Sequence, residues 1–264
     1  MPDQDEQASQ PIGFPQSRFF KEQRAPTLPS PSEVRALNLQ SGNDRANNFY
    51  RPSPVMVPAM GLLVKYGADV TRVELETQIW VREQLDGRVP IPEVFGWAED
   101  GEQGFIYMAL VDGKPLQELW GGMTEGSLGD RRLNDIFLRC HPDLAGPFCG
   151  PDAVRQFQDG CDIEIPPADV AIAFTHNDLV APNILLSLGP NPKVAAVIDW
   201  AQSGWYPAYW ECCKAKRVRY PPKNSSDEVL QDEWAAKYVP LIPDPVDDEK
   251  YNYPWIYFVL SKGI

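Results

Sequence analysis

Residues 174–183 read FTHNDLVAPN and contain the most specific pattern in the chain. It contains a histidine, an aspartate and an asparagine at positions 176, 178 and 183. Two apolar runs follow, at residues 184–186 and 194–198, and the segment between them contains the Gly-Pro-Asn-Pro sequence of residues 189–192. Short apolar runs separated by a turn of this composition predict a β-hairpin.

The predicted hairpin brings two oxygen-bearing side chains together. Asn183 precedes its first strand and Asp199 follows its second, and the midpoint of these two positions, residue 191, lies inside the turn. We therefore expect Asn183 and Asp199 to lie side by side at the open end of the hairpin. Amide and carboxylate oxygens are the ligands that a hard cation such as Mg²⁺ prefers.

The H-x-D-L-x-x-x-N spacing of residues 176–183 matches the catalytic loop of kinases. In that chemistry an aspartate orients the acceptor hydroxyl and takes its proton, while an asparagine and a second aspartate hold magnesium against the phosphates. The pattern predicts Asp178 as the catalytic base and Asn183 and Asp199 as magnesium ligands, with His176 bracing the loop rather than transferring protons. The structural alternative is that Asp178 and Asn183 cap a turn and Asp199 ends a buried strand.

These motifs resemble those of a known family. Residues 176–183, the VIDW sequence of residues 197–200 and the SGWYPAYWE sequence of residues 203–211 are similar to the fungal branch of the aminoglycoside phosphotransferase and choline kinase-like proteins. The resemblance covers most of the chain from about residue 45 to residue 264. It implies an α+β, two-lobed protein-kinase-like fold with a small β-rich N-lobe and a mainly helical C-lobe. It also implies ATP- and Mg²⁺-dependent phosphorylation of a small-molecule hydroxyl.

The composition of the chain indicates which kinds of molecule it is expected to bind. The chain has 264 residues, a formal net charge of -13 and a sequence pI of about 4.6. So acidic a chain argues against nucleic acid and anionic membranes as partners and favours a cationic, amine-bearing substrate. No apolar run approaches the roughly 20 residues that span a bilayer, and the initial MPDQDE lacks the features of a signal peptide, so we expect a cytoplasmic protein.

The chain is expected to have three parts. Residues 1–44 are rich in Pro, Gln, Ser and charged residues, which predicts a disordered or loosely ordered segment. Residues 45–112 would form the N-lobe, and residues 113–264 the C-lobe with the catalytic loop and the metal site.

The N-lobe contains candidates for nucleotide binding. Lys65 ends an apolar strand at residues 62–66, comparable to the kinase strand whose lysine pairs with the α and β phosphates. A helix expected at about residues 71–85 carries Glu74 and Glu76. In kinases a helix glutamate fixes this lysine, and the family pattern favours Glu74 over Glu76. The structural alternative is that these three charged side chains are simply solvated.

Strands at residues 94–98 and 104–111 are expected to close the N-lobe. Residues 106–113, IYMALVDG, resemble the family's hinge between the lobes, which implies that the backbone of Met108, Ala109 and Leu110 receives the adenine. There is no G-x-G-x-x-G loop, and residues 51–61 contain prolines instead. The phosphates must therefore be covered differently than in protein kinases.

The segment after Asp199 is rich in aromatic and basic residues. Gln202 and Ser203 are expected near the metal. The aromatic cluster, taken as core in preference to a cation-π site for an amine, comprises Trp205, Tyr206, Tyr209 and Trp210. The basic residues, interpreted as a solvated helix face, are Lys214, Lys216, Arg217 and Arg219.

The chain departs from the family pattern at residues 116–134. The family has a long pair of helices before a Gly-Ser-hydrophobic-Gly turn, whereas here residues 120–125 run directly into GSLG at residues 126–129. The C-lobe is therefore expected to be shortened, by a real deletion or by an exon lost from the gene model. The alternative function is a catalytically degenerate or truncated relative that binds nucleotide or a partner without turnover. The sequence leaves the substrate and the oligomeric state open.

Overall fold

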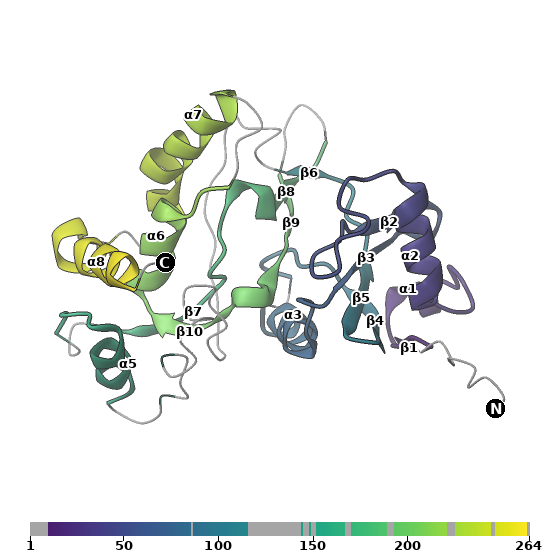
Figure 1. Cartoon of the computed structure of the whole chain (residues 1–264), viewed down its shortest axis with the longest axis horizontal. Helices are drawn as coiled ribbons and strands as arrows, with labels where there is room; N and C mark the ends of the chain where they lie inside the picture. The colour runs from purple at the N-terminus through teal and green to yellow at the C-terminus, as the bar shows by residue number, and fades with distance from the viewer. Residues whose placement is uncertain are drawn as a thin grey trace. The chain divides into compact units, whose positions relative to one another are not determined.

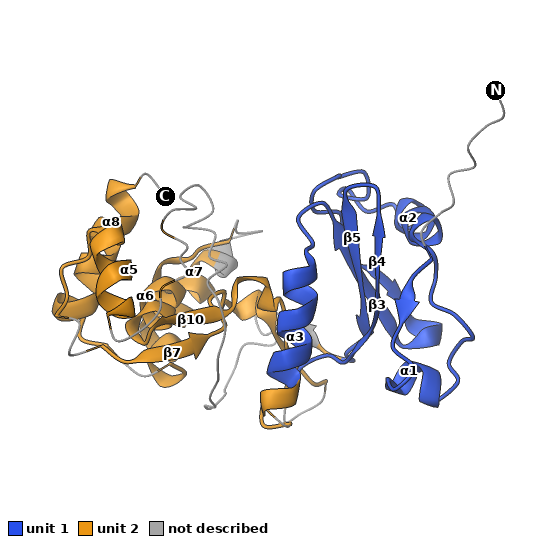
Figure 2. Ribbon diagram, turned by 90° about the horizontal axis from the view of Figure 1, so that it is seen from below, with its two compact units in different colours: residues 1–82, 91–112 blue, residues 83–90, 113–264 orange. Residues whose placement is uncertain are grey.

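The computed structural model of the chain describes residues 10–85, 87–115, 144, 148, 152–166, 170–188, 193–220, 225–243 and 246–262. The chain divides into two compact units (Figure 2). Unit 1 comprises residues 1–82 and 91–112, and unit 2 comprises residues 83–90 and 113–264.

Unit 1 is built on a five-stranded antiparallel sheet with the strand order β1-β4-β5-β3-β2 (Figure 1). Its strands are β1 (Ile12–Gly13), β2 (Val55–Val57), β3 (Leu62–Gly67), β4 (Val94–Asp100) and β5 (Gln103–Ala109). Its helices are α1 (Arg18–Lys21), α2 (Pro31–Gln40), the 3₁₀ turn η1 (Pro58–Met60) and α3 (Arg72–Leu85), whose last three residues belong to unit 2.

The two faces of this sheet pack against different helices. Figure 2 shows α3 on one side of the sheet and α1 and α2 on the other. Because side chains alternate along a strand, Phe105 and Tyr107 of β5 pack with Phe19 and Val34, whereas Ile106 packs on the opposite face with Leu75 of α3. Lys65 lies opposite Ile106 in the β3–β5 register, which places it on the face that α3 covers.

The N-terminal segment differs from the expectation of loose order. Residues 1–9 lie outside the described residues, but residues 12–40 contain β1, α1 and α2. A capping box between Ser30 and Glu33 begins α2. Phe19, Leu28 and Val34 are buried in the core of unit 1. Composition predicted disorder because polar residues outnumber apolar ones in this segment. The three apolar residues nevertheless cover the sheet face opposite α3.

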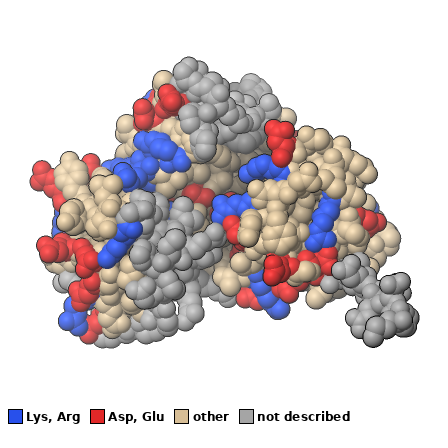
Figure 3. All heavy atoms as spheres, viewed as in Figure 1, with Lys and Arg blue, Asp and Glu red and all other residues tan. Residues whose placement is uncertain are grey.

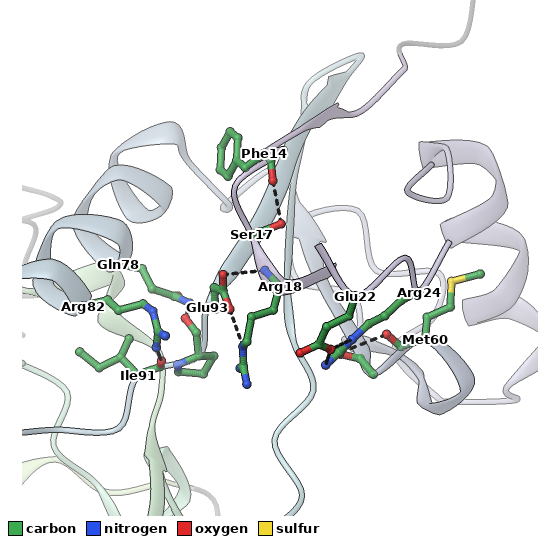
Figure 4. Close-up of polar contacts among 12 residues, drawn as sticks. Phe14, Ser17, Arg18, Glu22, Arg24, Met60, Gln78, Arg82, Ile91 and Glu93 are labelled. Carbon is green, nitrogen blue, oxygen red and sulfur yellow. Dashed lines mark hydrogen bonds and ion pairs between the residues drawn. The ribbon is translucent and has the colours of Figure 1, made fainter. Parts of the chain in front are cut away.

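Polar contacts also tie this segment to the sheet (Figure 4). The backbone N–H and Nε of Arg18 donate to the two carboxylate oxygens of Glu93, at 2.9 and 2.7 Å. Burial raises the pKa of Glu93, but the contacts with Arg18 outweigh it and lower the pKa overall. Arg24 donates to the carbonyls of Met60 and Gly61, at 3.4 and 3.3 Å. The segment therefore holds both β4 and the turn that leads into β3.

We expect Phe19→Ala to lower the free energy of unfolding by about 3–5 kcal/mol, the usual cost of truncating a buried aromatic residue. Phe19 is fully buried, and its ring centroid lies 5.4 Å from that of Phe95. Urea unfolding followed by fluorescence would measure the change. Leu39→Ala on α2 is the control, because Leu39 is 54% exposed and should change stability little. Equal midpoints for the two variants would show that the segment adds nothing to the core.

Unit 2 combines two small sheets with helices (Figure 1). The sheets are β6-β8-β9 and β10-β7, formed by β6 (Lys114–Pro115), β7 (Ile172–Thr175), β8 (Ile184–Leu186), β9 (Val194–Val197) and β10 (Gly204–Pro207). The α-helices are α5 (Ala153–Cys161), α6 (Tyr209–Arg217), α7 (Ser225–Glu233) and α8 (Tyr253–Ser261). Shorter 3₁₀ and π turns are η4 (Ala181–Asn183), η5 (Trp200–Gln202), η6 (Trp234–Tyr238), η7 (Val239–Leu241) and η8 (Asp248–Asn252).

The centre of unit 2 is aromatic. Tyr206, Tyr209 and Trp210 are buried together with Phe157 of α5 and with Trp255 and Phe258 of α8. These three residues of the aromatic cluster therefore belong to the core, as predicted in preference to an amine site. Trp205 is half-buried, and its ring packs edge-on against Phe174 with centroids 6.2 Å apart.

Two predicted features lie outside the described residues: the shortened segment at 116–134 and the hairpin turn at 189–192. Among the helices that the structure does describe, none combines the length and the apolar character needed to cross a bilayer.

Candidate active site

The predicted catalytic loop lies between two strand pairs that bring it against the segment after β9. β7 pairs with β10, and β8 pairs with β9, which confirms the predicted hairpin. Ile198 N–H donates to the carbonyl of Asn183 at 2.9 Å, and Ser203 Oγ donates to the carbonyl of His176 at 3.1 Å. The loop of residues 176–183 and the segment 198–203 are therefore joined at both ends. This places Asn183 beside the residue that precedes Asp199.

Asp178 and Asn183 contact each other directly. Asn183 Nδ2 donates to the carbonyl of Asp178 at 2.9 Å and to its Oδ2 at 3.0 Å. With the amide nitrogen directed at Asp178, the acceptor of the Asn183 side chain is Oδ1, an oxygen suited to a magnesium ion. Asn183 is largely buried, with 9% of its surface exposed, so this orientation is held by its surroundings.

His176 braces the site through both ring nitrogens. Nδ1 accepts the backbone N–H of Asp178 at 3.2 Å, and Nε2 lies 2.9 Å from the carbonyl of Ile198. These contacts require a neutral ring with its hydrogen on Nε2. Burial lowers the pKa of His176, although Glu211 and Asp199 oppose this effect, which also favours the neutral ring. His176 thus links the backbone of Asp178 to the residue before Asp199, in line with the expected bracing role.

The backbone is left-handed at two positions of the site. Asn177 has φ 65° and Asp199 has φ 64°, a region that residues other than glycine seldom adopt. Such a conformation persists where the surrounding contacts hold it, and it concentrates at functional sites. One of the two left-handed residues, Asn177, immediately precedes Asp178, and the other, Asp199, is itself the predicted metal ligand.

Sequence reasoning missed two residues of α6. Glu211 belongs to a quoted motif but was given no role, and the interpretation of Lys214 as part of a solvated helix face is wrong because only 1% of it is exposed. Glu211 Oε1 and Oε2 accept the backbone N–H of Asn177 at 3.0 and 3.1 Å. Lys214 Nζ donates to Gln202 Oε1 at 2.8 Å. Their spacing of three residues places both on one side of the helix, and this is the signal that could have found them.

In unit 1, Lys65 pairs with Glu74. Its Nζ lies 2.5 Å from Glu74 Oε1, and Glu74 is 2% exposed. Glu76 is exposed and instead pairs with Arg72 at 3.0 Å. The difference follows from the helical period, because residues two apart on a helix point to different sides.

The hinge residues lie at the C-terminal end of β5, the central strand of the sheet. Met108 and Ala109 are buried, and Leu110 is half-buried. Ala109 N–H donates to the carbonyl of Glu93 at 2.8 Å, and Leu110 N–H donates to that of Gly61 at 3.0 Å. An adenine ring that used these two amides would have to replace both bonds.

Comparisons with known proteins agree with the motifs. A model of the family described as the Phosphotransferase enzyme family matches residues 142–239. An aminoglycoside 3'-phosphotransferase of Niallia circulans is 22% identical over 214 residues, which cover 69% of this chain and 75% of that protein.

Solved structures show similarity at low sequence identity. The aminoglycoside phosphotransferase APH(3'')-Id of Streptomyces rimosus has a TM-score of 0.43 at 17% identity, over 86% of this chain and 96% of that chain. A thermostable mutant of APH(4)-Ia in its apo form has a TM-score of 0.46 at 15% identity, over 79% of each chain.

The family match spans the loop of residues 176–183, the hairpin after it and α6, which are the elements that the structure brings together. The α+β, two-lobed architecture predicted from the sequence is confirmed. Residues 142–239 therefore match the Phosphotransferase enzyme family, and the chain is similar to an aminoglycoside phosphotransferase over 69% of its length.

Proposed function

We propose that this protein is a phosphotransferase that uses MgATP to phosphorylate the hydroxyl of a small, amine-bearing molecule. The observation that carries the proposal is the double strand pairing, which holds the loop with Asp178 and Asn183 against the segment that begins at Asp199. This arrangement supplies a base and two oxygen ligands in the order that phosphoryl transfer requires.

Each residue of the loop has a separate role. Asp178 orients the acceptor hydroxyl and takes its proton, and its carboxylate is itself oriented by Asn183. Asn183 and Asp199 fit a magnesium ion, since they offer hard oxygen donors and Mg²⁺ needs few protein ligands when phosphates and water complete its shell. When bound, the ion neutralises charge on the transferring phosphate. His176 holds the backbone of the loop and moves no proton.

Lys65 and Glu74 form the nucleotide-binding part of unit 1. Glu74 is buried, and its contact with Lys65 fixes the direction of the lysine side chain toward one position. A lysine held in this way is suited to pair with the α and β phosphates of ATP. Met108, Ala109 and Leu110 remain the proposed backbone contacts of the adenine.

The acceptor class is inferred from charge and from the relatives. The net charge of -13 favours a cationic acceptor. On the face shown in Figure 3, acidic side chains lie beside basic ones over both units. The relative from Niallia circulans is an aminoglycoside 3'-phosphotransferase, whose named substrate class carries amines and hydroxyls. Tyr206, Tyr209 and Trp210 are buried in the core, so they are not proposed as the amine site. Acidic side chains at the surface are the proposed contacts of the amine.

Thermal unfolding with and without MgATP tests the nucleotide site. We expect MgATP at about 100 times its dissociation constant to stabilise the protein by roughly 2.7 kcal/mol. For a domain of this size, that raises Tm by about 5–10 °C. Lys65→Met should lose most of this shift because its phosphate contact is gone. Lys193→Met, which changes an exposed lysine, should keep it.

Phosphate transfer from labelled ATP to a panel of hydroxylated amines then tests turnover. A Tm shift without transfer to any acceptor would favour the non-catalytic alternative. If MgATP did not change the Tm of the wild-type protein, this result would contradict the proposal as a whole. The shortening of the C-lobe that supports the non-catalytic alternative is predicted at residues 116–134, outside the described residues.

A further inference from the structure

We propose that Glu211 and Lys214, two buried charged residues of α6, are positioning residues for phosphoryl transfer. Together they hold the turn before Asp178 and the segment after Asp199 in one arrangement. The kinetic consequence rests on the proposed function, whereas the structural consequence can be tested without it.

The first observation is the burial of two charged side chains in one helix. Glu211 is 5% exposed and Lys214 is 1% exposed. Their neighbours Trp210 and Cys213 belong to one apolar cluster of unit 2, and Cys212 belongs to another. Burying a charge is costly unless hydrogen bonds and opposite charges compensate it. The groups that hydrogen-bond to the side chains of Glu211 and Lys214 therefore indicate which segments of the chain these side chains hold in place.

Backbone amides of the loop of residues 176–183 compensate the buried charge of Glu211. Both of its carboxylate oxygens accept the backbone N–H of Asn177, the residue with left-handed backbone. Burial raises the pKa of Glu211, while His176, the backbone amides of Asn177 and His176 and the charge of Lys214 act against this increase. The carboxylate thus holds the two residues immediately before Asp178, and it stabilises the left-handed backbone of Asn177, a conformation that is uncommon outside glycine.

Lys214 is directed at the other segment. Its Nζ donates to Gln202 Oε1 at 2.8 Å. The backbone carbonyl of Gln202 accepts Asn177 Nδ2 at 3.2 Å, and Ser203 Oγ donates to the carbonyl of His176. The two charged residues, separated by three positions on α6, therefore contact both segments of the site, and those segments also contact each other.

This arrangement governs where the reacting groups lie. Asp178 follows Asn177 directly, and Asp199 is three residues before Gln202. Neither Glu211 nor Lys214 is assigned a contact with substrate. Glu211 acts through the backbone amide of Asn177, and Lys214 acts through the side chain of Gln202. A misplacement of about 1 Å can slow an enzyme on the order of 10²-fold even when the changed residue is remote from the chemistry.

Glu211→Gln is the principal test, since it retains size and one acceptor oxygen but removes the charge and the second acceptor. We expect kcat to fall on the order of 10²-fold with the KM for ATP nearly unchanged. Hydrogen exchange measured by mass spectrometry should show lost protection of the amides at residues 176–178. Lys214→Met should lower kcat in the same direction, because Gln202 loses its donor.

The double variant Glu211→Gln/Lys214→Met separates positioning from simple stability. The charge of Lys214 favours the ionised form of Glu211, so removing one charge takes away part of the compensation of the other, and the double variant should recover part of the Tm lost by either single variant. The double variant should still be slow, because Asn177 lacks the charged, two-oxygen acceptor and Gln202 lacks its donor. Recovery of kcat together with Tm would overturn the proposal.

Gln231→Met is the matched control for loss of a buried polar side chain. Gln231 is 5% exposed, accepts the N–H of Tyr220 at 2.9 Å and donates to its carbonyl at 3.0 Å. It should lower Tm and leave kcat unchanged.

The outcomes also separate this proposal from the proposed function. If the wild-type protein transfers no phosphate, the function fails, and amide exchange alone decides the positioning role. Retained protection of residues 176–178 in Glu211→Gln would overturn it, and lost protection would support it. If Glu211→Gln does not fold, Lys214→Met is judged by the same two measurements.

Discussion

Asp199→Asn is expected to abolish phosphoryl transfer and leave Tm unchanged. Asparagine keeps the shape of the side chain and tolerates the left-handed backbone at this position, where φ is 64°, but it lacks the charge that holds magnesium. Charge stabilisation by a catalytic metal is worth several kcal/mol. Each 1.36 kcal/mol changes the rate tenfold, so kcat should fall on the order of 10³-fold or more. Initial rates at saturating ATP over a range of magnesium concentrations measure the loss.

The left-handed backbone at Asp199 predicts different stabilities for two inactive variants of this residue. Asp199→Gly and Asp199→Ala should both be inactive, but only Ala should also lose stability, by about 1–2 kcal/mol, because its Cβ disfavours the left-handed conformation. Asp162→Asn is the matched control. Asp162 is an aspartate of unit 2 that also has a left-handed backbone, with φ 56°, and it pairs with Lys262. If the Asn and Gly variants at 199 kept rates within tenfold of that control, Asp199 would not be a metal ligand.

Asp178→Asn should lower kcat by about 10²–10⁴-fold, the usual contribution of a general base. The stabilisation by MgATP should remain, since Asp178 is assigned to the acceptor hydroxyl and not to the phosphates. Single-turnover transfer with MgATP bound in advance would isolate the chemical step from nucleotide binding. The carboxylate is oriented by Asn183 Nδ2 at 3.0 Å, so the variant keeps an oxygen that can accept this bond.

Asp159→Asn, on the exposed side of α5, is the control for that experiment and should leave both rate and stability unchanged. A normal kcat in Asp178→Asn would rule out Asp178 as the base. Loss of both the rate and the MgATP shift would instead assign Asp178 to nucleotide binding.

The geometry that sequence predicted best is local. The hairpin between Asn183 and Asp199 follows from two apolar runs around a turn, and backbone pairing then brings its ends together. The pairing of Lys65 with Glu74 follows from alternation along β3 and the period of α3. In both cases, neighbours in space are close in sequence, so periodicity and spacing are sufficient to place them.

Two errors share a physical cause. Residues 12–40 have the composition of a disordered segment, yet Phe19 and Val34 are buried because a sheet face formed by residues far along the chain receives them. Lys214 has the pattern of a solvated lysine, yet it is buried, and its amine donates to Gln202, a residue outside its helix. In both cases, the environment of a side chain depends on distant segments, which composition does not report.

Residue types and their spacing were sufficient to predict which residues would supply the base and the metal oxygens, and that Asn183 and Asp199 would meet at the open end of a hairpin. The contacts that hold these segments together are visible only in the tertiary structure. Only folding brings α6 against the loop of residues 176–183, where Glu211 accepts the amide of Asn177 and Lys214 contacts Gln202. Residue type and spacing specify reactivity and local backbone pairing. A buried charge, in contrast, is stable only beside partners from other parts of the chain, and so its role is settled by the tertiary fold.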